Sequence, residues 1–315
     1  MKIVVLDKDT LGADIDLSPL RAVGECAEYG TTAPEQIAAR VATAEVIVTN
    51  KLKLGAHNLQ NAAALRLICV AATGYDNIDT VYCQSRGIAL CNVPGYSTES
   101  VAQLTVTMAL SLVTNLTAYR EYTHSGAYTT SGLANRLDPV YHELSSLTWG
   151  VVGGGGIGTR VAAVARALGC RVQMCRRKAE GDFPLCDIDT LCRTSDIISL
   201  HVPLTDSTRG MINRERIAAM KKGAIVVNTA RGAVTDEAAL AEAVASGHLG
   251  GLGVDVYSVE PFSKEHPFWV LRERENVCLT PHMAWGAVEA RARCVAAMAE
   301  NITRFFAGER HNRVV

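Results

Sequence analysis

The sequence predicts an α/β protein with two domains, each built around a parallel sheet covered by helices. Three observations support this fold class. Apolar, strand-like runs alternate with helix-like runs from end to end, which is typical of parallel sheets. A glycine-rich turn joins a strand to a helix near residue 153 and opens a second series of strands. The length of 315 residues suits two domains better than one small core.

The first third of the chain carries the first strand series. Apolar runs predict strands at residues 3–6, 46–49, 67–70 and 88–92. Helices are expected between them, near residues 34–44, 59–65 and 79–86. These elements form the core of the first domain, which we assign to residues 1–98.

A Pro-Gly pair at residues 94 and 95 interrupts this pattern and marks a crossover to the second domain. A long apolar helix is expected from about residue 99 to 119, with Ser97 or Thr98 as its N-cap. Residues 125–139 are rich in Ser, Thr and Gly without periodicity and predict an arm or loop. The second strand series is expected at residues 147–152, 171–175, 197–200, 224–228, 251–256 and 277–280. The last helix, 288–306, is expected to return to the first domain, so that residues 287–315 complete that domain and 99–286 form the second.

Composition and charge exclude several classes of partner. The chain is 48% hydrophobic with a formal net charge of −1, which gives no reason to expect nucleic acid or an anionic membrane. No apolar run approaches the ~18 residues that a membrane span needs. The chain begins with a short strand followed by an acid rather than a signal peptide, so a cytoplasmic location is expected. The ten cysteines are scattered and predict reduced thiols, and no Cys or His spacing supports a metal site.

The glycine-rich turn is the most informative motif. Gly153, Gly155 and Gly158 follow an apolar run that ends at Val152, and apolar residues at helical spacing come next. Glycine permits the tight turn and lets backbone N–H groups approach a pyrophosphate, which the positive end of the helix also attracts. Strand, glycine turn and helix together predict a dinucleotide-binding site.

Three strand ends in the second series carry groups suited to hydride transfer onto a keto acid. The runs lead into Arg231, Glu260 and His282, and ligands of open parallel sheets bind outside the carboxyl ends of the strands. Histidine exchanges a proton near neutral pH, and arginine binds a carboxylate through two N–H groups. A neighbouring carboxylate favours the imidazolium form, and strand order makes Glu260 the expected neighbour. A single Arg, Glu or His at a strand end is more often a structural or solvated residue. The three together indicate a catalytic site for this hydride transfer.

The chain resembles the D-isomer-specific 2-hydroxyacid dehydrogenase family. The matching segments appear in the family's order and span most of the chain: TGYDNID (73–79), GGGGIG (153–158), HVPLT (201–205), NTARG (228–232), GVDVYSVEP (253–261) and TPHMAW (280–285). Residues 92–103 and 281–293 are similar to the glycerate dehydrogenase and hydroxypyruvate (glyoxylate) reductase members. The resemblance implies a Rossmann-type sheet inserted into a smaller flavodoxin-like substrate domain.

The resemblance also implies roles for individual residues. His282 corresponds to the acid/base, Glu260 to its carboxylate partner and Arg231 to the substrate-binding cation. Backbone N–H groups of Thr73 and Gly74 correspond to those that bind the substrate carboxylate. The implied cofactor contacts are Gly156 and Ile157 at the pyrophosphate, Val202, Pro203 and Thr208 along the adenosine, and Thr229, Ala230 and Asp255 at the nicotinamide. The family implies a cytoplasmic homodimer, with an arm near residues 122–141 reaching the partner.

The second strand of the dinucleotide unit departs from the usual NAD pattern. An acid about 20 residues beyond the glycines normally bonds the ribose 2′-hydroxyl. Here Arg176 stands 18 positions after Gly158, followed by Arg177 and Lys178. Guanidinium groups bind a 2′-phosphate with charge-assisted hydrogen bonds, so the sequence predicts a preference for NADP(H) over NAD(H).

Several alternatives stay open. The substrate is expected to be a small 2-keto acid such as hydroxypyruvate or glyoxylate, with lactate-type or bulkier acids as the alternative. Phosphoglycerate dehydrogenase activity is disfavoured, because the 73–79 segment has no basic cluster for a phosphate. A dinucleotide sensor of the corepressor type, without catalysis, is disfavoured by the joint presence of the Arg, Glu and His. Lys51 and Tyr128 are residues whose place in the substrate pocket the sequence does not decide.

Overall fold

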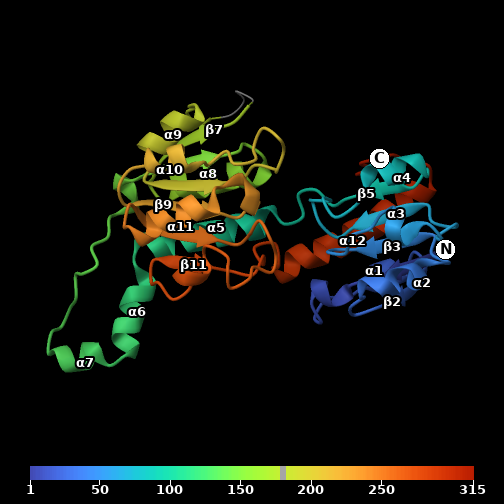
Figure 1. The fold of residues 1–315 in the computed structure, drawn as a ribbon, viewed down its shortest axis with the longest axis horizontal. Coiled ribbons are helices and arrows are strands. Elements are labelled where there is room, and N and C mark those ends of the chain that lie inside the picture. The colour runs from blue at the N-terminus through green and yellow to red at the C-terminus, as the bar shows by residue number, and fades with distance from the viewer. Residues whose placement is uncertain (178–181) are drawn as a thin grey trace. The chain divides into compact units, whose positions relative to one another are not determined.

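The computed structural model describes residues 1–177 and 182–315 and divides into two compact units. Unit 1 comprises Met1–Ser97 and Trp285–Val315, and unit 2 comprises Thr98–Ala284. Each unit is a parallel sheet with helices on both faces, which confirms the predicted α/β class (Figure 1).

Unit 1 contains a five-stranded sheet in the order β2-β1-β3-β4-β5. Its strands are β1 (Lys2–Val5), β2 (Glu25–Glu28), β3 (Val46–Thr49), β4 (Leu67–Val70) and β5 (Ala89–Cys91). This 2-1-3-4-5 order is the flavodoxin-like arrangement that the sequence predicts. Short 3-10 turns, Lys8–Leu11 and Pro34–Gln36, follow β1 and precede α2.

Alternate residues of β1, β3, β4 and β5 enter two separate cores. Ile3 and Val5 of β1 pack against α1 (Ser18–Arg21) and the long α12 (Val288–Phe306), which covers one face of the sheet. Val4 packs on the other face, with α2 (Ile37–Val41), α3 (Ala56–Leu59) and α4 (Thr80–Ser85). Both faces are buried, which is why these strands read as continuous apolar runs.

Unit 2 contains a six-stranded sheet in the order β11-β10-β9-β8-β6-β7. The strands are β6 (Thr148–Val152), β7 (Arg171–Cys175), β8 (Ile197–Leu200), β9 (Ala224–Asn228), β10 (Leu249–Val254) and β11 (Val277–Leu279). An isolated parallel bridge from Met174 to Leu185 adds one more pairing at β7. Counting that bridge as the third strand gives the 3-2-1-4-5-6 order of a Rossmann-type sheet, with a seventh strand at the edge.

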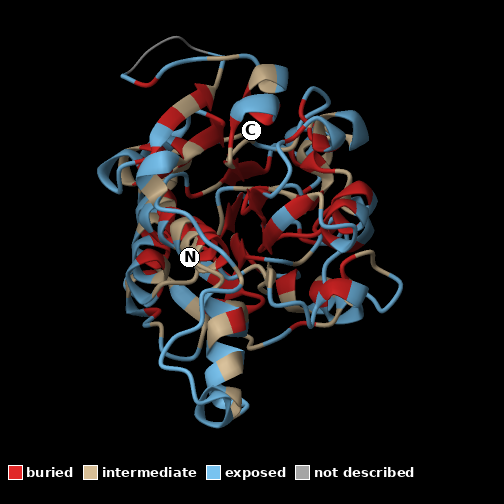
Figure 2. Ribbon diagram, turned by 90° about the vertical axis from the view of Figure 1, so that its left-hand side faces the viewer, coloured by how far each residue is buried: buried red, intermediate tan, exposed pale blue. Residues whose placement is uncertain are grey.

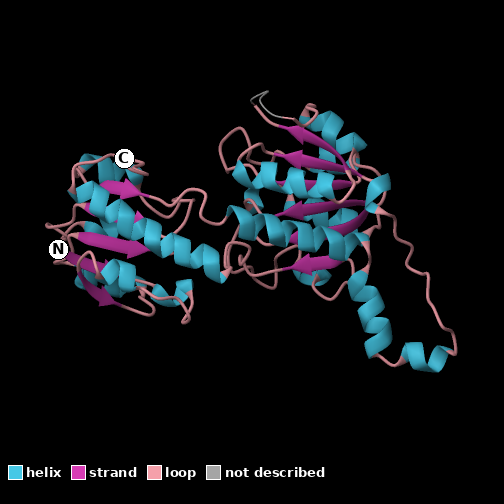
Figure 3. Cartoon of the chain, turned by 180° about the vertical axis from the view of Figure 1, so that it is seen from behind, coloured by secondary structure: helices cyan, strands magenta, loops and turns pink. Residues whose placement is uncertain are grey.

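Helices cover both faces of the sheet of unit 2 (Figure 3). One face carries α5 (Thr98–Val113) and α8 (Gly156–Ala167), and the other carries α9 (Ile188–Thr194), α10 (Arg214–Ala218) and α11 (Glu237–Ala245). Trp149 of β6 is fully buried, and its indole N–H donates to the Ser199 hydroxyl of β8 at 3.0 Å. Buried residues gather on the strands and on the helix surfaces that face them (Figure 2).

Three local predictions were wrong. The single helix expected at 99–119 is two helices, α5 and α6 (Leu116–His124), because Asn115 takes a left-handed φ of 50°. The helix expected at 59–65 lies earlier, as α3 (Ala56–Leu59), where the Asn58 side chain accepts the Gly55 N–H at 3.1 Å. The expected irregular arm contains a short helix, α7 (Ala127–Ser131), and the half-exposed edge strand β2 has no counterpart among the predicted strands.

Candidate active site

The glycine turn between β6 and α8 is held by close backbone contacts. Gly153 has a φ of 109°, and a Cβ there would lie 2.4 Å from the His201 carbonyl oxygen. A Cβ on Gly158 would lie 2.1 Å from the carbonyl oxygen of Gly153. Only glycine fits at either position, so β6, β8 and the start of α8 approach closely. The first N–H groups of α8 have no partner within the helix and therefore suit an anion at this turn.

A cavity of about 970 Å³ lies at the carboxyl ends of β6, β7 and β8. This is the switch point of the sheet, where strand order reverses and dinucleotides bind. Its lining includes Gly153, Gly154, Gly155, Arg176, Arg177, His201, Val202, Pro203, Thr205, Ser207 and Thr208. The Thr208 hydroxyl donates to the Pro203 carbonyl at 2.6 Å and accepts the Thr205 N–H at 2.8 Å, which fixes this wall.

Arg176 leaves β7 and lies across the glycine turn. A Cβ on Gly154 would meet the Arg176 Cδ at 2.5 Å, so the aliphatic stem covers that glycine. The Arg176 Nε and Nη2 atoms are buried without a hydrogen-bond partner. Buried guanidinium groups without an acceptor are costly, and an anionic ligand removes that cost. Arg177 is exposed and lines the same cavity, whereas Lys178 lies outside the described residues.

His201 follows β8 and faces the same cavity. Its Nε2 atom is buried without a hydrogen-bond partner. Burial lowers the pKa of His201 to about 3, because an apolar environment disfavours the imidazolium. His201 is therefore neutral at physiological pH.

We expect acidification to destabilise the protein through His201. The folded-state pKa of about 3 lies below the unfolded value of 6.5, so the contribution is present above pH 6.5 and is lost as pH falls towards 3. Between pH 7 and pH 5 the loss is about 2 kcal/mol of unfolding free energy. Denaturant titrations of wild type and His201→Gln at pH 7 and pH 5 give the unfolding free energy that each protein loses on acidification. The loss in wild type minus the loss in the variant measures the contribution of His201. An equal loss in both proteins contradicts the assignment.

The loop after β9 is organised by Asn228. Its side-chain amide donates to the Arg231 carbonyl at 3.0 Å and its Oδ1 accepts the Ala230 N–H at 3.0 Å. The Thr229 hydroxyl contacts the Thr105 hydroxyl of α5 at 2.9 Å. Asn228 was not among the predicted site residues, although it stands at the end of a buried strand and opens the NTARG segment (228–232) that helps to carry the resemblance.

His282 and Glu260 form a direct pair. The His282 Nδ1 lies 2.7 Å from the Glu260 Oε2, with side chains 27% and 33% exposed. The Glu260 Oε1 accepts the Tyr257 N–H at 2.9 Å. Because a carboxylate only accepts, the proton of this contact sits on Nδ1. His282 has a φ of 51°, a strained conformation that the surrounding contacts must hold.

Asp255 supplies those contacts. It is buried, and its Oδ1 accepts the Thr280 hydroxyl at 2.6 Å and the Met283 N–H at 2.8 Å. Its Oδ2 accepts the Ala284 N–H at 2.9 Å. Asp255 is one of the cofactor contacts that the resemblance implies, and in the structure it also secures the turn that carries His282.

The remaining predicted residues lie in two places. Ile157 packs its side chain into the core between α5 and α8, and Gly156 begins α8. Thr73 and Gly74 belong to unit 1, where the Thr73 hydroxyl donates to the Val93 carbonyl at 2.9 Å. Unit 2 thus contains the three residues predicted to react and every predicted cofactor contact, whereas the two predicted carboxylate-binding amides belong to unit 1.

The two undecided residues belong to different units, Lys51 to unit 1 and Tyr128 to unit 2. Lys51, in unit 1, donates its backbone N–H to the buried Asp7 carboxylate at 2.8 Å, and its ammonium lies 6.0 Å from the Trp285 ring centroid. Tyr128 is an exposed residue of α7 whose hydroxyl donates to the Ala134 carbonyl at 3.2 Å.

Two other features concern the described residues, 1–177 and 182–315: metal-binding clusters and membrane-spanning helices. No group of three or more His, Cys, Asp or Glu side chains is arranged to hold a metal ion within these ranges. No single helix there is long and apolar enough to cross a membrane; α5 and α6 pass that test only as a pair, bent by 64°.

Comparisons with known proteins assign the chain to a family. The family model for the D-isomer specific 2-hydroxyacid dehydrogenase NAD binding domain matches residues 106–284. A glycerate dehydrogenase of Methylorubrum extorquens is 34% identical over 99% of this chain and 98% of its own. A hydroxypyruvate reductase of Blautia hydrogenotrophica is 32% identical over 100% and 99%.

Solved structures agree with this assignment. The D-lactate dehydrogenase of Aquifex aeolicus, complexed with NAD and lactic acid, superimposes with a TM-score of 0.82 at 30% identity. That match covers 98% of this chain and 96% of the other. The chain is therefore an oxidoreductase of the D-isomer specific 2-hydroxyacid dehydrogenase family, with a nicotinamide-dinucleotide-binding domain.

Proposed function

We propose that this enzyme reduces a small 2-keto acid of the hydroxypyruvate and glyoxylate class to the D-2-hydroxy acid, with NADPH preferred over NADH. The observation that carries the proposal is the 2.7 Å contact between His282 and Glu260, beside the dinucleotide sheet. The names of two full-length relatives, glycerate dehydrogenase and hydroxypyruvate reductase, support the substrate class.

Each reactive residue has a defined task in this proposal. Arg231 binds the substrate carboxylate through its guanidinium and polarises the carbonyl. His282 donates a proton from Nε2 to the carbonyl oxygen and recovers a proton from solvent afterwards. NADPH, when bound, supplies the hydride that the carbonyl carbon accepts. Glu260 holds the imidazole in orientation through Nδ1 and balances its positive charge.

The two domains bind different ligands in this proposal. We assign substrate binding to the domain of residues 1–98 and 287–315, with backbone N–H groups of Thr73 and Gly74 for the substrate carboxylate. Dinucleotide binding falls to residues 99–286. Two further points stay predictions. One is a homodimer formed through the arm at residues 122–141, and the other is a cytoplasmic location.

The preference for NADPH rests on the end of β7. Arg176 presents two buried nitrogen atoms without a partner at the cavity, and Arg177 lines the same wall. The 2′-phosphate of NADPH is an acceptor of suitable charge for both. NADH offers a neutral hydroxyl there and leaves the positive charge of the buried guanidinium without a counter-charge.

A steady-state panel tests the function. Hydroxypyruvate, glyoxylate, pyruvate and a bulkier branched keto acid are assayed with NADPH and with NADH. We expect the highest kcat/KM for hydroxypyruvate or glyoxylate with NADPH. Higher values for pyruvate or the branched acid contradict the substrate class, and a clear preference for NADH contradicts the cofactor assignment. Failure to reduce any keto acid, with NADPH still bound, favours a dinucleotide sensor.

A further inference from the structure

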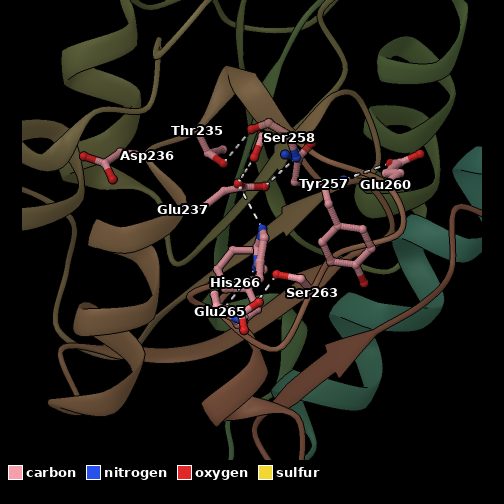
Figure 4. A network of polar contacts seen from close by, with 12 residues as sticks. Thr235, Asp236, Glu237, Tyr257, Ser258, Glu260, Ser263, Glu265 and His266 are labelled. Atoms are coloured by element: carbon pink, nitrogen blue, oxygen red, sulfur yellow. Dashed lines mark hydrogen bonds and ion pairs between the residues drawn. The ribbon is translucent and has the colours of Figure 1, made fainter.

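The carboxylate of Glu237 binds the loop that carries Glu260. Glu237 is the first residue of α11, and its side chain is only 10% exposed. Its Oε1 accepts the Ser258 N–H at 2.9 Å, and its Oε2 accepts the Ser258 hydroxyl (Figure 4). The His266 Nε2 lies 3.1 Å from the same Oε2.

The contacts of His266 determine which of its two ring nitrogens carries the proton. Its Nδ1 accepts the Phe268 N–H at 3.2 Å, so Nδ1 carries a lone pair and Nε2 carries the proton. Nε2 therefore donates to Glu237. The ring also packs against Tyr257 and Phe262, at centroid distances of 5.8 and 5.1 Å. Glu237 thus accepts three hydrogen bonds, two from the exposed Ser258 and one from His266, whose side chain is only 8% exposed.

The loop that Glu237 holds at Ser258 also contacts the His282–Glu260 pair. Tyr257, the neighbour of Ser258, donates its N–H to the Glu260 Oε1 at 2.9 Å (Figure 4). The other Glu260 oxygen lies 2.7 Å from the His282 Nδ1. The Tyr257 hydroxyl donates to the Thr280 carbonyl at 2.9 Å, two residues before His282. A displacement of Ser258 is therefore transmitted to both members of the pair.

The same loop also lies against the segment of Arg231. A Cβ on Gly232 would lie 2.1 Å from the Ser258 nitrogen and 2.1 Å from the Tyr257 carbonyl carbon. The two backbones are in direct contact, one residue after Arg231. The Thr235 hydroxyl donates to the Gly232 carbonyl at 3.0 Å and holds that turn.

From these contacts we propose that Glu237 is a positioning residue for the reaction. It fixes Ser258, and through the Tyr257–Ser258 backbone it sets Glu260 against His282 and aligns the Arg231 segment. Glu237 itself contacts none of these three side chains in the interactions described above. The proposal rests on the proposed function, because it names what aligns that function's reactive groups.

Glu237→Gln tests the proposal with minimal change in shape. A carboxamide has one acceptor oxygen and adds an N–H₂ donor, so it cannot satisfy three incoming donors. We expect kcat for keto acid reduction to fall roughly 10- to 100-fold, the range for small misplacement of reacting groups. The Kd for NADPH should stay unchanged. Glu242→Gln is the matched control, because Glu242 lies on the same helix and pairs with Arg214 at the surface.

A second variant separates positioning from a merely structural role. Ser258→Ala removes the hydroxyl contact with Glu237 and keeps the backbone one. We expect a smaller loss of kcat, and a double variant no slower than Glu237→Gln, because both changes break one network. Thermal unfolding checks that each variant is folded. Wild-type kcat in folded Glu237→Gln, or losses that add in the double variant, overturns the proposal. A wild-type enzyme that reduces no keto acid instead contradicts the proposed function.

Discussion

Replacement of His282 by Asn is expected to lower kcat for keto acid reduction about 100- to 10,000-fold, the range for loss of a general acid. Asparagine retains a side-chain amide that reaches towards Glu260, yet it has no proton to exchange near neutral pH. Cofactor affinity should persist, because the cavity at β6, β7 and β8 does not include His282. Turnover and fluorescence titration with NADPH measure the two quantities separately.

His57→Asn is a control for this result, since His57 is an exposed residue of α3 in unit 1. It should leave kcat unchanged. If His282→Asn also keeps wild-type turnover, His282 is not the acid and the mechanism proposed above is wrong. If it loses NADPH binding together with turnover, the variant has disturbed the dinucleotide site and the stated role is likewise contradicted.

Arg176→Ala is expected to reverse the cofactor preference. Hydrogen bonds to charged groups contribute about 1.5–3 kcal/mol, which corresponds to a loss of roughly 10- to 150-fold in kcat/KM for NADPH. The value for NADH should stay the same or rise, because the variant removes a buried guanidinium that NADH leaves unpaired. The measurement is kcat/KM for both cofactors at saturating keto acid.

Arg193→Ala provides the comparison on α9, because Arg193 is an exposed residue of the same unit. Its cofactor ratio should equal that of wild type. Parallel losses with NADPH and NADH in Arg176→Ala indicate damage to the pocket rather than to phosphate recognition. That outcome contradicts the role assigned to Arg176.

The sheets could be predicted because their strands are buried on both faces. Val46–Thr49, Leu67–Val70, Ile197–Leu200 and Ala224–Asn228 match the predicted ranges residue for residue. Prediction failed where local geometry interrupts a continuous pattern. The apolar periodicity runs on beyond Val113, and only the left-handed Asn115 separates α5 from α6. Edge strand β2 (Glu25–Glu28) presents two acids at its ends and has no apolar run to mark it.

The hydrogen-bonding residues around the site were harder to predict than the three residues proposed to react there. Arg231, Glu260 and His282 stand at strand ends, a position that sequence order reveals. Asn228, Glu237 and Ser258 make hydrogen bonds to residues 2 to 29 positions away in the sequence, and no periodicity records such pairs. The orientation of Arg176 over Gly154 also depends on how β6 and β7 pair in space.

Product analysis of a single reaction tests the central claim most directly. Purified wild-type enzyme is incubated with hydroxypyruvate and NADPH, and the glycerate formed is resolved by chiral chromatography while NADPH oxidation is followed by absorbance. The account predicts D-glycerate in equal amount to the NADPH consumed. Formation of L-glycerate, or no NADPH oxidation with hydroxypyruvate, contradicts it.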